Sequence, residues 1–346
     1  MRKCSAKVCG GSRWRCRTAR TGAADGAAVR APHVIIPVGM SEYAIGIDLG
    51  GTNLRAAAID RSGNIIDKIG AATNFEKGLE AVLGDIVAAI STLRGKHGPG
   101  DLAGIGVGVP GFIRMKEGFI TNSNNLPYLE NFPVRDELSR RLGTPVILEN
   151  DANAAALGEK WRGAGKDVDD LVLLTLGTGV GGGIISGGRV LRGSVGMAGE
   201  LGHTTVVPNG NPCGCGNQGC LEKHASATAV VAMAQMLHLG ENLSAKDVGD
   251  LAGQAGETGD KARAIWASVG EALGIALATL VNTFNFPLYL LSGGPLPSWD
   301  YFAPAMLRTV ERRSFTYRAT KPRIEKATLG NEAGLYGAAY LPWLES

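Results

Sequence analysis

One arrangement occurs twice in this chain and constrains its fold more than any other feature: an apolar strand, a glycine-rich turn and a second strand. The first copy covers residues 43–59, with Asp-Leu-Gly-Gly-Thr-Asn at 48–53, and the second covers residues 171–186, with Gly-Thr-Gly-Val-Gly-Gly-Gly at 177–183. Further strands and helices follow each copy. The repeat predicts an α/β protein built from two related halves. A ligand would bind in the cleft between such halves.

Hydrophobic periodicity predicts the other elements and a division into two domains. We expect residues 41–149 together with 331–346 to form a smaller domain, and residues 150–330 to form a larger one. We expect no apolar run to approach the ~20 residues that span a membrane. The predicted strands are 43–48, 54–60, 64–70, 104–109, 145–148, 171–176, 184–185, 287–291 and 323–327, and the predicted helices are 76–94, 135–142, 152–162, 225–238, 246–254, 258–283, 300–312 and 332–341.

The two glycine-rich turns are candidate phosphate sites. Glycines let backbone N–H groups point at phosphate oxygens, and Asp48 could hold a hydrated Mg²⁺. Either turn alone would more often be a tight hairpin, but a third glycine pair, Gly293-Gly294, follows another predicted strand and favours a nucleotide. The chain has no P-loop motif. Two G-x-G-x-x-G matches, at 106–111 and 177–182, lack the helix that must follow directly in a dinucleotide site.

Asn150 and Asp151 precede an alanine-rich predicted helix. The simpler interpretation of Asp151 is an N-cap, which stabilises a helix by ~1 kcal/mol. An aspartate at a helix N-terminus between two domains could also accept a proton from a substrate hydroxyl, because such a hydroxyl is a poor nucleophile until a carboxylate orients it.

A short segment contains a complete Cys₃His set for a structural zinc ion. Its members are His203, Cys213, Cys215 and Cys220, with Glu200 and Glu222 on either side. His224 is a rival imidazole ligand, four residues after Cys220. The two glutamates and His203 could also be ordinary loop residues, and Glu222 could complement a helix dipole.

Charge and cysteine are distributed unevenly along the chain. Residues 1–39 hold eight Lys/Arg against Asp25, a net +7, which leaves residues 40–346 at −4 of the overall +3. Nucleic-acid binding by that acidic part is therefore not expected. The clustered thiols favour a reducing, cytoplasmic location over a disulfide framework. Residues 1–39 lack the apolar region of a signal peptide. We interpret them as an annotation artefact before a start at Met40, with a disordered tail or an organelle-type basic leader as the alternatives.

Five motifs, in order, resemble the ROK family of repressors, open reading frames and kinases. The likeness runs from about residue 43 to 342. The motifs are Ile-Asp-Leu-Gly-Gly-Thr-Asn at 47–53, Asn-Asp-Ala-Asn-Ala-Ala-Ala-Leu-Gly-Glu at 150–159, the turn at 175–183, Ala-Gly-Glu-Leu-Gly-His at 198–203 and Cys-Gly-Cys-Gly-Asn-Gln-Gly-Cys-Leu-Glu at 213–222. This resemblance implies the two-domain actin/hexokinase/Hsp70-like (ribonuclease H-like) α/β fold with an interdomain cleft.

The resemblance also implies residue roles. Asp151 would be the catalytic base acting on a sugar 6-hydroxyl. The sugar would be bound by Gly111, Asn150, Glu200, His203 and Glu222, and zinc by His203, Cys213, Cys215 and Cys220. The groups around ATP and its Mg²⁺ would be Asp48, Gly50, Gly51, Thr52, Asn53, Thr178, Gly179, Gly293 and Gly294.

These roles imply an ATP-dependent hexose kinase, with glucose as the expected substrate and a homodimer as the expected assembly. The alternatives are mannose, an N-acetylglucosamine or N-acetylmannosamine kinase, polyphosphate as donor, and a sugar-responsive repressor. One departure bears on the substrate: glucokinases of the family often read Asn-Leu-Pro-Gly-Trp where this chain reads Asn-Leu-Pro-Tyr-Leu at 125–129. The 39-residue extension is shorter than the helix-turn-helix segment of the family's repressors.

Overall fold

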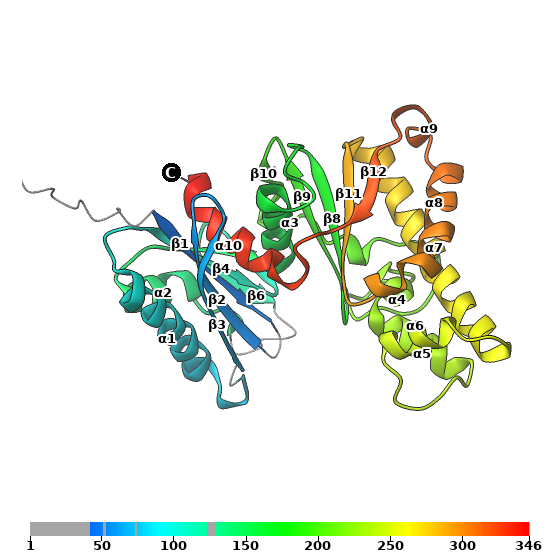
Figure 1. The fold of residues 1–346 in the computed structure, drawn as a ribbon, viewed down its shortest axis with the longest axis horizontal. Coiled ribbons are helices and arrows are strands. Elements are labelled where there is room, and N and C mark those ends of the chain that lie inside the picture. Colours follow the sequence, from blue (N-terminus) through cyan, green and yellow to red (C-terminus); the bar gives the residue numbers. More distant parts are fainter. Residues whose placement is uncertain (1–41, 51–52, 73–74, 123–128, 346) are drawn as a thin grey trace, which may run out of the picture. The chain divides into compact units, whose positions relative to one another are not determined.

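The computed structural model describes residues 42–50, 53–72, 75–122 and 129–345 (Figure 1). Three sequence predictions lie outside these ranges: the nature of residues 1–39, the nucleotide roles of Gly51 and Thr52, and the altered motif at 125–128. Residues 40–346 form one compact unit.

The first sheet has five strands in the order β3-β2-β1-β4-β7. β1, β2 and β3 are antiparallel neighbours, whereas β4 and β7 run parallel to β1. Their bounds are β1 Tyr43–Leu49, β2 Asn53–Asp60, β3 Ile65–Ala72, β4 Leu102–Val109 and β7 Val146–Asn150. These strands lie where the sequence predicted them, because each is an apolar segment between turns.

The second sheet repeats the first. Its order is β10-β9-β8-β11-β12, with β8, β9 and β10 antiparallel and β11 and β12 parallel to β8. The strands are β8 Leu171–Leu176, β9 Val180–Ser186, β10 Arg189–Val190, β11 Leu288–Gly293 and β12 Arg323–Lys326. The predicted repeat is therefore confirmed at the level of topology. The hairpin of β5 (Phe112–Arg114) and β6 (Phe119–Asn122) and the two-residue β10 were not predicted.

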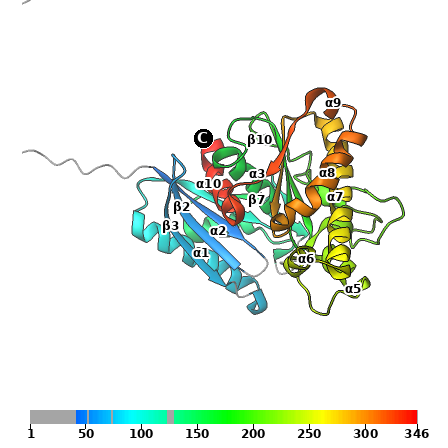
Figure 2. The ribbon, with the colours of Figure 1, turned by 45° about the vertical axis from the view of Figure 1, so that its right-hand side comes forward.

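Helices cover the sheets in separate layers (Figures 1 and 2). The first sheet packs on α1 and α2, and the second on the long α7 with α8 and the shorter α4, α5 and α6. The predicted helix 225–238 is two helices, because Ser226 caps α5 through its hydroxyl and ends α4. The bounds are α1 Leu79–His97, α2 Val134–Leu142, α4 Glu222–Ala225, α5 Ala227–Met236, α6 Ala245–Ala252, α7 Glu257–Phe284, α8 Trp299–Arg313 and α9 Tyr317–Thr320, with short 3₁₀ turns Phe75–Lys77, Leu201–His203, Leu296–Ser298 and Gly330–Glu332.

Two further helices, α3 (Asp151–Arg162) and α10 (Ala333–Glu345), pack against each other between the sheets. α3 leaves the first sheet and packs on β8 and β9 of the second, whereas α10 leaves the second and packs on β1 and β4 of the first. Glycine permits this close crossing: a Cβ on Gly158 would overlap the carbonyl of Ala333, and one on Gly337 would overlap that of Ala154. The start of α3 is thereby held at the junction of the two sheets.

The expectation about apolar runs was wrong for α7. This helix is long and apolar enough to cross a membrane, with a mean hydropathy of 1.7 over its best window. However, 67% of that window is buried inside the protein, and Trp266, Leu273 and Leu277 are fully buried. A core helix of a soluble protein has the same composition, so core packing accounts for the apolar residues of α7.

Candidate functional site

The site begins where β7 passes directly into α3. The side chain of Asn150 is the N-cap, because its Oδ1 accepts from the N–H groups of Ala152 (3.0 Å) and Asn153 (3.2 Å). Its Nδ2 donates to the carbonyl of Gly111 at 3.3 Å. The N-cap interpretation of Asp151 was therefore wrong: Asp151 is the first helical residue. Because Asn150 caps the helix, the carboxylate of Asp151 is not needed as a cap, which favours another role for it.

Asp151 lies among other acids. The pKa of its carboxyl is raised to about 6, mainly by burial; the Ala152 N–H opposes this shift, and the charges of Asp48 and Glu200 add to it. These interactions bring together residues that are far apart in the sequence. A carboxylate with a pKa near neutrality can accept a proton under ordinary conditions and release it again.

Asp48 stands near the end of β1, one residue before the glycine turn. Burial raises the pKa of its carboxyl, and Arg55, whose Nη1 lies 3.7 Å from Oδ2, opposes that shift. The carboxylate lies over the start of α10, since a Cβ on Gly334 would come within 2.9 Å of Oδ1. Gly50 and Asn53 close the turn through an N–H···O bond of 2.9 Å. Asp48 is thus half-buried and able to take a cation through water.

The second turn lies beside the end of β11. Gly177 donates to the carbonyl of Gly179 at 2.9 Å. Gly294 donates to the carbonyl of Leu176 at 3.0 Å, and Gly293 has φ 112°, which favours glycine. The predicted nucleotide residues Thr178, Gly179, Gly293 and Gly294 therefore meet at the carboxyl ends of two adjacent parallel strands. Ligands commonly bind at such an edge of an α/β sheet.

The start of α4 and α5 supports this second turn from behind. Glu222 accepts the Val180 N–H at 3.1 Å through Oε2. Ala227 donates to the carbonyl of Gly177 at 2.8 Å, and Thr228 Oγ1 donates to that of Thr178 at 2.7 Å. One oxygen of Glu222 is thus engaged with the turn, a connection that the sequence did not suggest.

The four predicted zinc ligands come together. One ligand atom from each of His203, Cys213, Cys215 and Cys220 lies within 4.8 Å of the others. His203 Nδ1 is 3.6 Å from Cys213 Sγ, while its Nε2 lies 4.0 Å from Glu200 Oε2. The imidazole therefore faces the thiols with one nitrogen and an acid of the site with the other.

The chemistry of this donor set fits zinc. Three thiols and one imidazole are its usual structural ligands. Burial, followed by its thiol neighbours, raises the pKa of Cys220 to about 12, so that a thiolate there needs a cation beside it. The rival His224 is not in the cluster. Its buried Nε2 has no hydrogen-bond partner among the described residues, and burial lowers its pKa.

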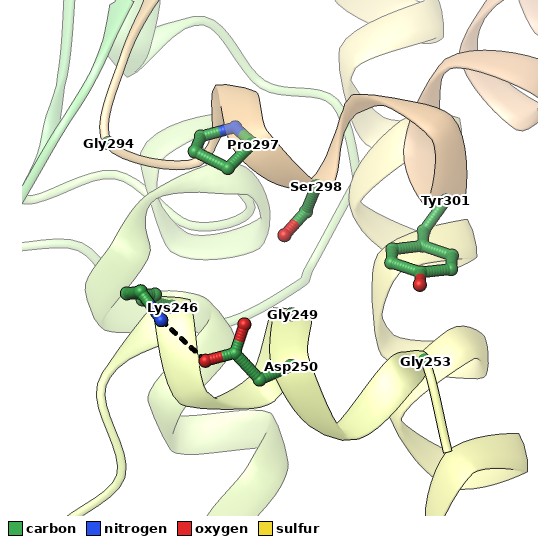
Figure 3. Close-up of a pocket in the computed structure, with 8 residues that line it drawn as sticks. All are labelled: Lys246, Gly249, Asp250, Gly253, Gly294, Pro297, Ser298 and Tyr301. Carbon is green, nitrogen blue, oxygen red and sulfur yellow. Dashed lines mark hydrogen bonds and ion pairs between the residues drawn. The ribbon is translucent and has the colours of Figure 1, made fainter. Parts of the chain in front are cut away.

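A pocket of about 350 Å³ opens beside Gly294 (Figure 3). It lies between α6 and the 3₁₀ turn that leads into α8. Lys246 forms an ion pair with Asp250 of 2.5 Å at one side, and Tyr301 lines the other. Apart from the Gly293-Gly294 pair, no sequence pattern indicated this pocket.

The sequence analysis also did not identify three polar residues whose contacts support the start of α3. Glu149, immediately before Asn150, is 1% exposed and pairs with Arg192. Burial raises the pKa of Glu149, and Arg192 opposes that shift. Asn153 is 2% exposed and donates to Glu149 at 3.1 Å. A charged residue at the end of the apolar β7 was the available signal.

Comparisons with known proteins agree with this geometry. The ROK family model matches residues 44–343. The glucokinase of Halalkalibacterium halodurans is 39% identical, over 86% of this chain and 94% of that protein. The crystal structure of a ROK hexokinase from Thermus thermophilus matches with a TM-score of 0.76 and 35% identity, over 88% of this chain and 98% of that one. A ROK family glucokinase from Streptomyces griseus, in complex with glucose and AMPPNP, matches with a TM-score of 0.71 and 33% identity, over 86% and 98%.

More distant relatives include proteins of other kinds. The N-acetyl-D-glucosamine kinase of Haemophilus influenzae is 31% identical, over 86% of this chain and 98% of that protein. The xylose repressor of Caldicellulosiruptor bescii is 32% identical, over 85% of this chain but 76% of the repressor. The fold class predicted from the sequence, the actin-like α/β fold, is confirmed by the solved structures. With five motifs in order and a family model that matches residues 44–343, the chain belongs to the ROK family.

Proposed function

We propose that this protein is an ATP-dependent hexose kinase that phosphorylates the 6-hydroxyl of glucose. The observation that carries the proposal is Asp151: a buried carboxylate on the first residue of α3, near Asp48 of β1 and Glu200 of the loop after β10, with a pKa of about 6. The glucokinase relatives support glucose, and the glycine turns support a nucleotide.

Asp151 is the general base of this reaction. It accepts the proton of the 6-hydroxyl as that oxygen attacks the γ-phosphorus of ATP, and ADP leaves. Phosphoryl transfer depends on positioning and charge stabilisation more than on covalent help from the protein. The cap made by Asn150 and the crossing of α3 with α10 hold the carboxylate in place.

The sugar is bound by the groups around Asp151. Glu200, His203 and Glu222 accept or share hydrogen bonds from its hydroxyls, Asn150 orients it, and Gly111 forms part of the pocket wall. Carboxylates and an imidazole fixed on rigid supports suit a ligand that is covered with hydroxyl groups.

ATP is bound by the other edge of the site. The backbone at Gly50, Asn53, Thr178 and Gly179, together with Gly51 and Thr52, surrounds its phosphates. Gly293 and Gly294 lead to the pocket of Figure 3, which binds the adenine of ATP. Mg²⁺ bound with ATP supplies positive charge at the phosphates. Asp48 is the residue that would hold it through water.

The Cys₃His cluster holds a structural zinc ion. Its residues fix His203 toward Glu200, and through Cys220 they fix the start of α4, where Glu222 lies. We further propose the division into residues 41–149 with 331–346 and residues 150–330, and a cytoplasmic homodimer.

Two alternatives compete with glucose kinase. An N-acetyl hexosamine or mannose kinase would keep every role above and change the substrate, since residues near position 2 of the sugar decide that choice. A sugar-responsive regulator would keep the sugar site without turnover. The identity of 39% to the glucokinase, against 32% to the xylose repressor, favours the kinase.

A coupled ATP-to-ADP assay tests the proposal. Glucose, mannose, N-acetylglucosamine, N-acetylmannosamine and fructose are compared, with Asp151→Asn as the control. Glucose turnover that the substitution abolishes supports the proposal in full. Turnover of an N-acetyl sugar alone would replace the substrate, and a folded, zinc-loaded protein that turns over none of them would overturn the kinase.

A further inference from the structure

An ion pair between a buried carboxylate and a half-buried arginine joins the two chain segments that carry the acids of the site. Glu149, at the end of β7, accepts from Arg192 Nε at 2.8 Å and from Nη2 at 2.7 Å through Oε2. Glu149 is 1% exposed, whereas the Arg192 side chain is 32% exposed. The two residues are separated by 43 positions, so the fold alone brings them together. Paired contacts of this kind fix orientation as well as distance.

The second oxygen of Glu149 holds the start of α3. Oε1 accepts from the Asn150 N–H at 3.0 Å and from Asn153 Nδ2 at 3.1 Å. Asn150 in turn caps the helix, and Asp151 is its first residue. The carboxylate of Glu149 thus has partners on both oxygens, and one of those partners is the backbone next to Asp151.

Arg192 holds the other segment, the loop from residue 192 to residue 199. The Arg192 carbonyl accepts from the Ala198 N–H at 3.1 Å and closes the base of this loop, two residues before Glu200. The tip of the loop touches the β5 hairpin: a Cβ on Gly196 would overlap the carbonyl of Ile113. Arg192 therefore sits at the root of the segment that delivers Glu200.

We propose that Arg192, through Glu149, is a positioning residue that sets the separation of Asp151 and Glu200. This inference rests on the proposed function, because the two acids would contact the same sugar. Without Arg192, Glu149 would be a buried carboxylate without its cation, an arrangement that a protein relieves by protonation or movement. Either response displaces Asn150 and the loop base together. A misplacement of about 1 Å at a reacting group costs about 10²-fold in rate.

Kinetics of Arg192→Gln test the proposal. We expect kcat/KM for the sugar to fall about tenfold to hundredfold, while KM for ATP, whose turns lie elsewhere, changes less than about threefold. Arg192→Lys keeps the charge but not the fork and should recover only part of the loss. Arg323→Gln is the matched control, because it removes a bidentate pair with Asp167 on the surface (2.9 Å to both oxygens).

A double-mutant cycle distinguishes loss of the Glu149–Arg192 interaction from a general loss of stability. Glu149→Gln with Arg192→Gln leaves a neutral pair and no uncompensated charge, so the double variant should lose less activity than the two single losses added together. Equal losses in sugar and ATP parameters, or strict additivity, would overturn the positioning role.

Hydrogen exchange decides the linkage without activity. In Arg192→Gln, amides at 150–154 and at 198–202 should exchange faster together, while those of β8 stay unchanged. Faster exchange in one segment alone would overturn the proposal. If the wild-type protein turns over no sugar, the proposed function fails by itself, and this exchange result still decides whether Arg192 links the two segments.

Discussion

The two sheets have the same strand order and directions, yet equivalent positions carry different chemistry. Asp48 pairs with Arg55 one step before the end of the β1–β2 hairpin, and Thr175 pairs with Gly181 one step before the end of the β8–β9 hairpin. One copy of the repeat thus presents a carboxylate where the other presents a hydroxyl. The repeated topology supplies the frame, while single residues at strand ends decide which half can hold a cation.

The two crossing helices differ in the same way. α3 begins with Asn150 as its cap and Asp151 as its first residue, whereas α10 begins with Ala333 and Gly334 after a short 3₁₀ turn. The missing side chain of Gly334 is what admits the carboxylate of Asp48. Each half therefore contributes one acid, Asp48 from a strand and Asp151 from a helix, and substitution of each acid in turn separates their roles.

Asp151→Asn should have the largest effect. We expect kcat to fall by about 10²–10⁴, because an amide cannot accept the proton of the sugar hydroxyl. In the wild type, kcat/KM should fall as the pH drops below about 6, where the carboxyl becomes protonated. Steady-state rates from pH 5 to pH 8 measure both. A variant that keeps more than a tenth of the wild-type kcat would remove Asp151 from the chemistry.

Asp48→Asn should reduce kcat by about 10², because the carboxylate would hold Mg²⁺ through water. Its equivalent in the other half, Thr175→Val, is the matched control and should leave the Mg²⁺ dependence unchanged. Titration of activity with Mg²⁺ compares the two variants. Identical Mg²⁺ curves for Asp48→Asn and the wild type would contradict the assignment of the cation to the first half.

The sequence predicted most elements to within a few residues, for a physical reason. Local sequence patterns predict buried strands between glycines, such as β1 and β8, and the long apolar α7. The break at Ser226 was missed because a cap competes with continuous helical periodicity. The hairpin β5–β6 was missed because its three- and four-residue strands are too short to show a period.

The site was predictable in part. The Cys₃His cluster could be found because its ligands lie within eighteen positions, and Asp151 because a polar motif interrupts apolar segments. The pair of Glu149 and Arg192 could not be found, since nothing local to either residue indicates a partner 43 positions away. The role of Glu222 at the second turn likewise depends on a tertiary hydrogen bond.

Removal of zinc should affect the second half alone. The metal would hold His203 and the start of α4, and α4 and α5 support the turn at 177–179. Chelation, or Cys213→Ser, should raise KM for the sugar about tenfold to hundredfold and lower the melting temperature. Zinc content by mass spectrometry and sugar titrations test this. A metal-free protein with an unchanged KM would show that the cluster does not orient the sugar ligands.

The smallest expected effect is on the free energy of unfolding, and it has opposite signs for substitutions of Asp151 and Asp167. The folded-state pKa of Asp151 is raised from 3.8 to about 6, so the folded protein binds more protons than the unfolded chain between these values. The free energy of unfolding therefore falls as the pH rises through that window and stays reduced above it. Asparagine carries no charge to bury, and Asp151→Asn should increase the free energy of unfolding by about 3 kcal/mol near pH 7.5.

Asp167 provides the reverse case on the surface. Its pKa is lowered, first by the hydrogen bond from Arg323, so its carboxylate stabilises the folded state above the unfolded pKa, and that contribution is lost as the pH falls through the folded pKa. Asp167→Asn should therefore decrease stability slightly near pH 7.5, where Asp151→Asn increases it. Urea unfolding of both variants near pH 7.5 and pH 4 measures the signs. The gain from Asp151→Asn should disappear near pH 4, where the wild-type carboxyl is already neutral in the folded state. A gain that persists at pH 4 would mean that packing, and not the buried charge, limits stability at the start of α3. A buried charge that lowers stability is the strongest physical sign that Asp151 is kept for function, and that result would remove this sign.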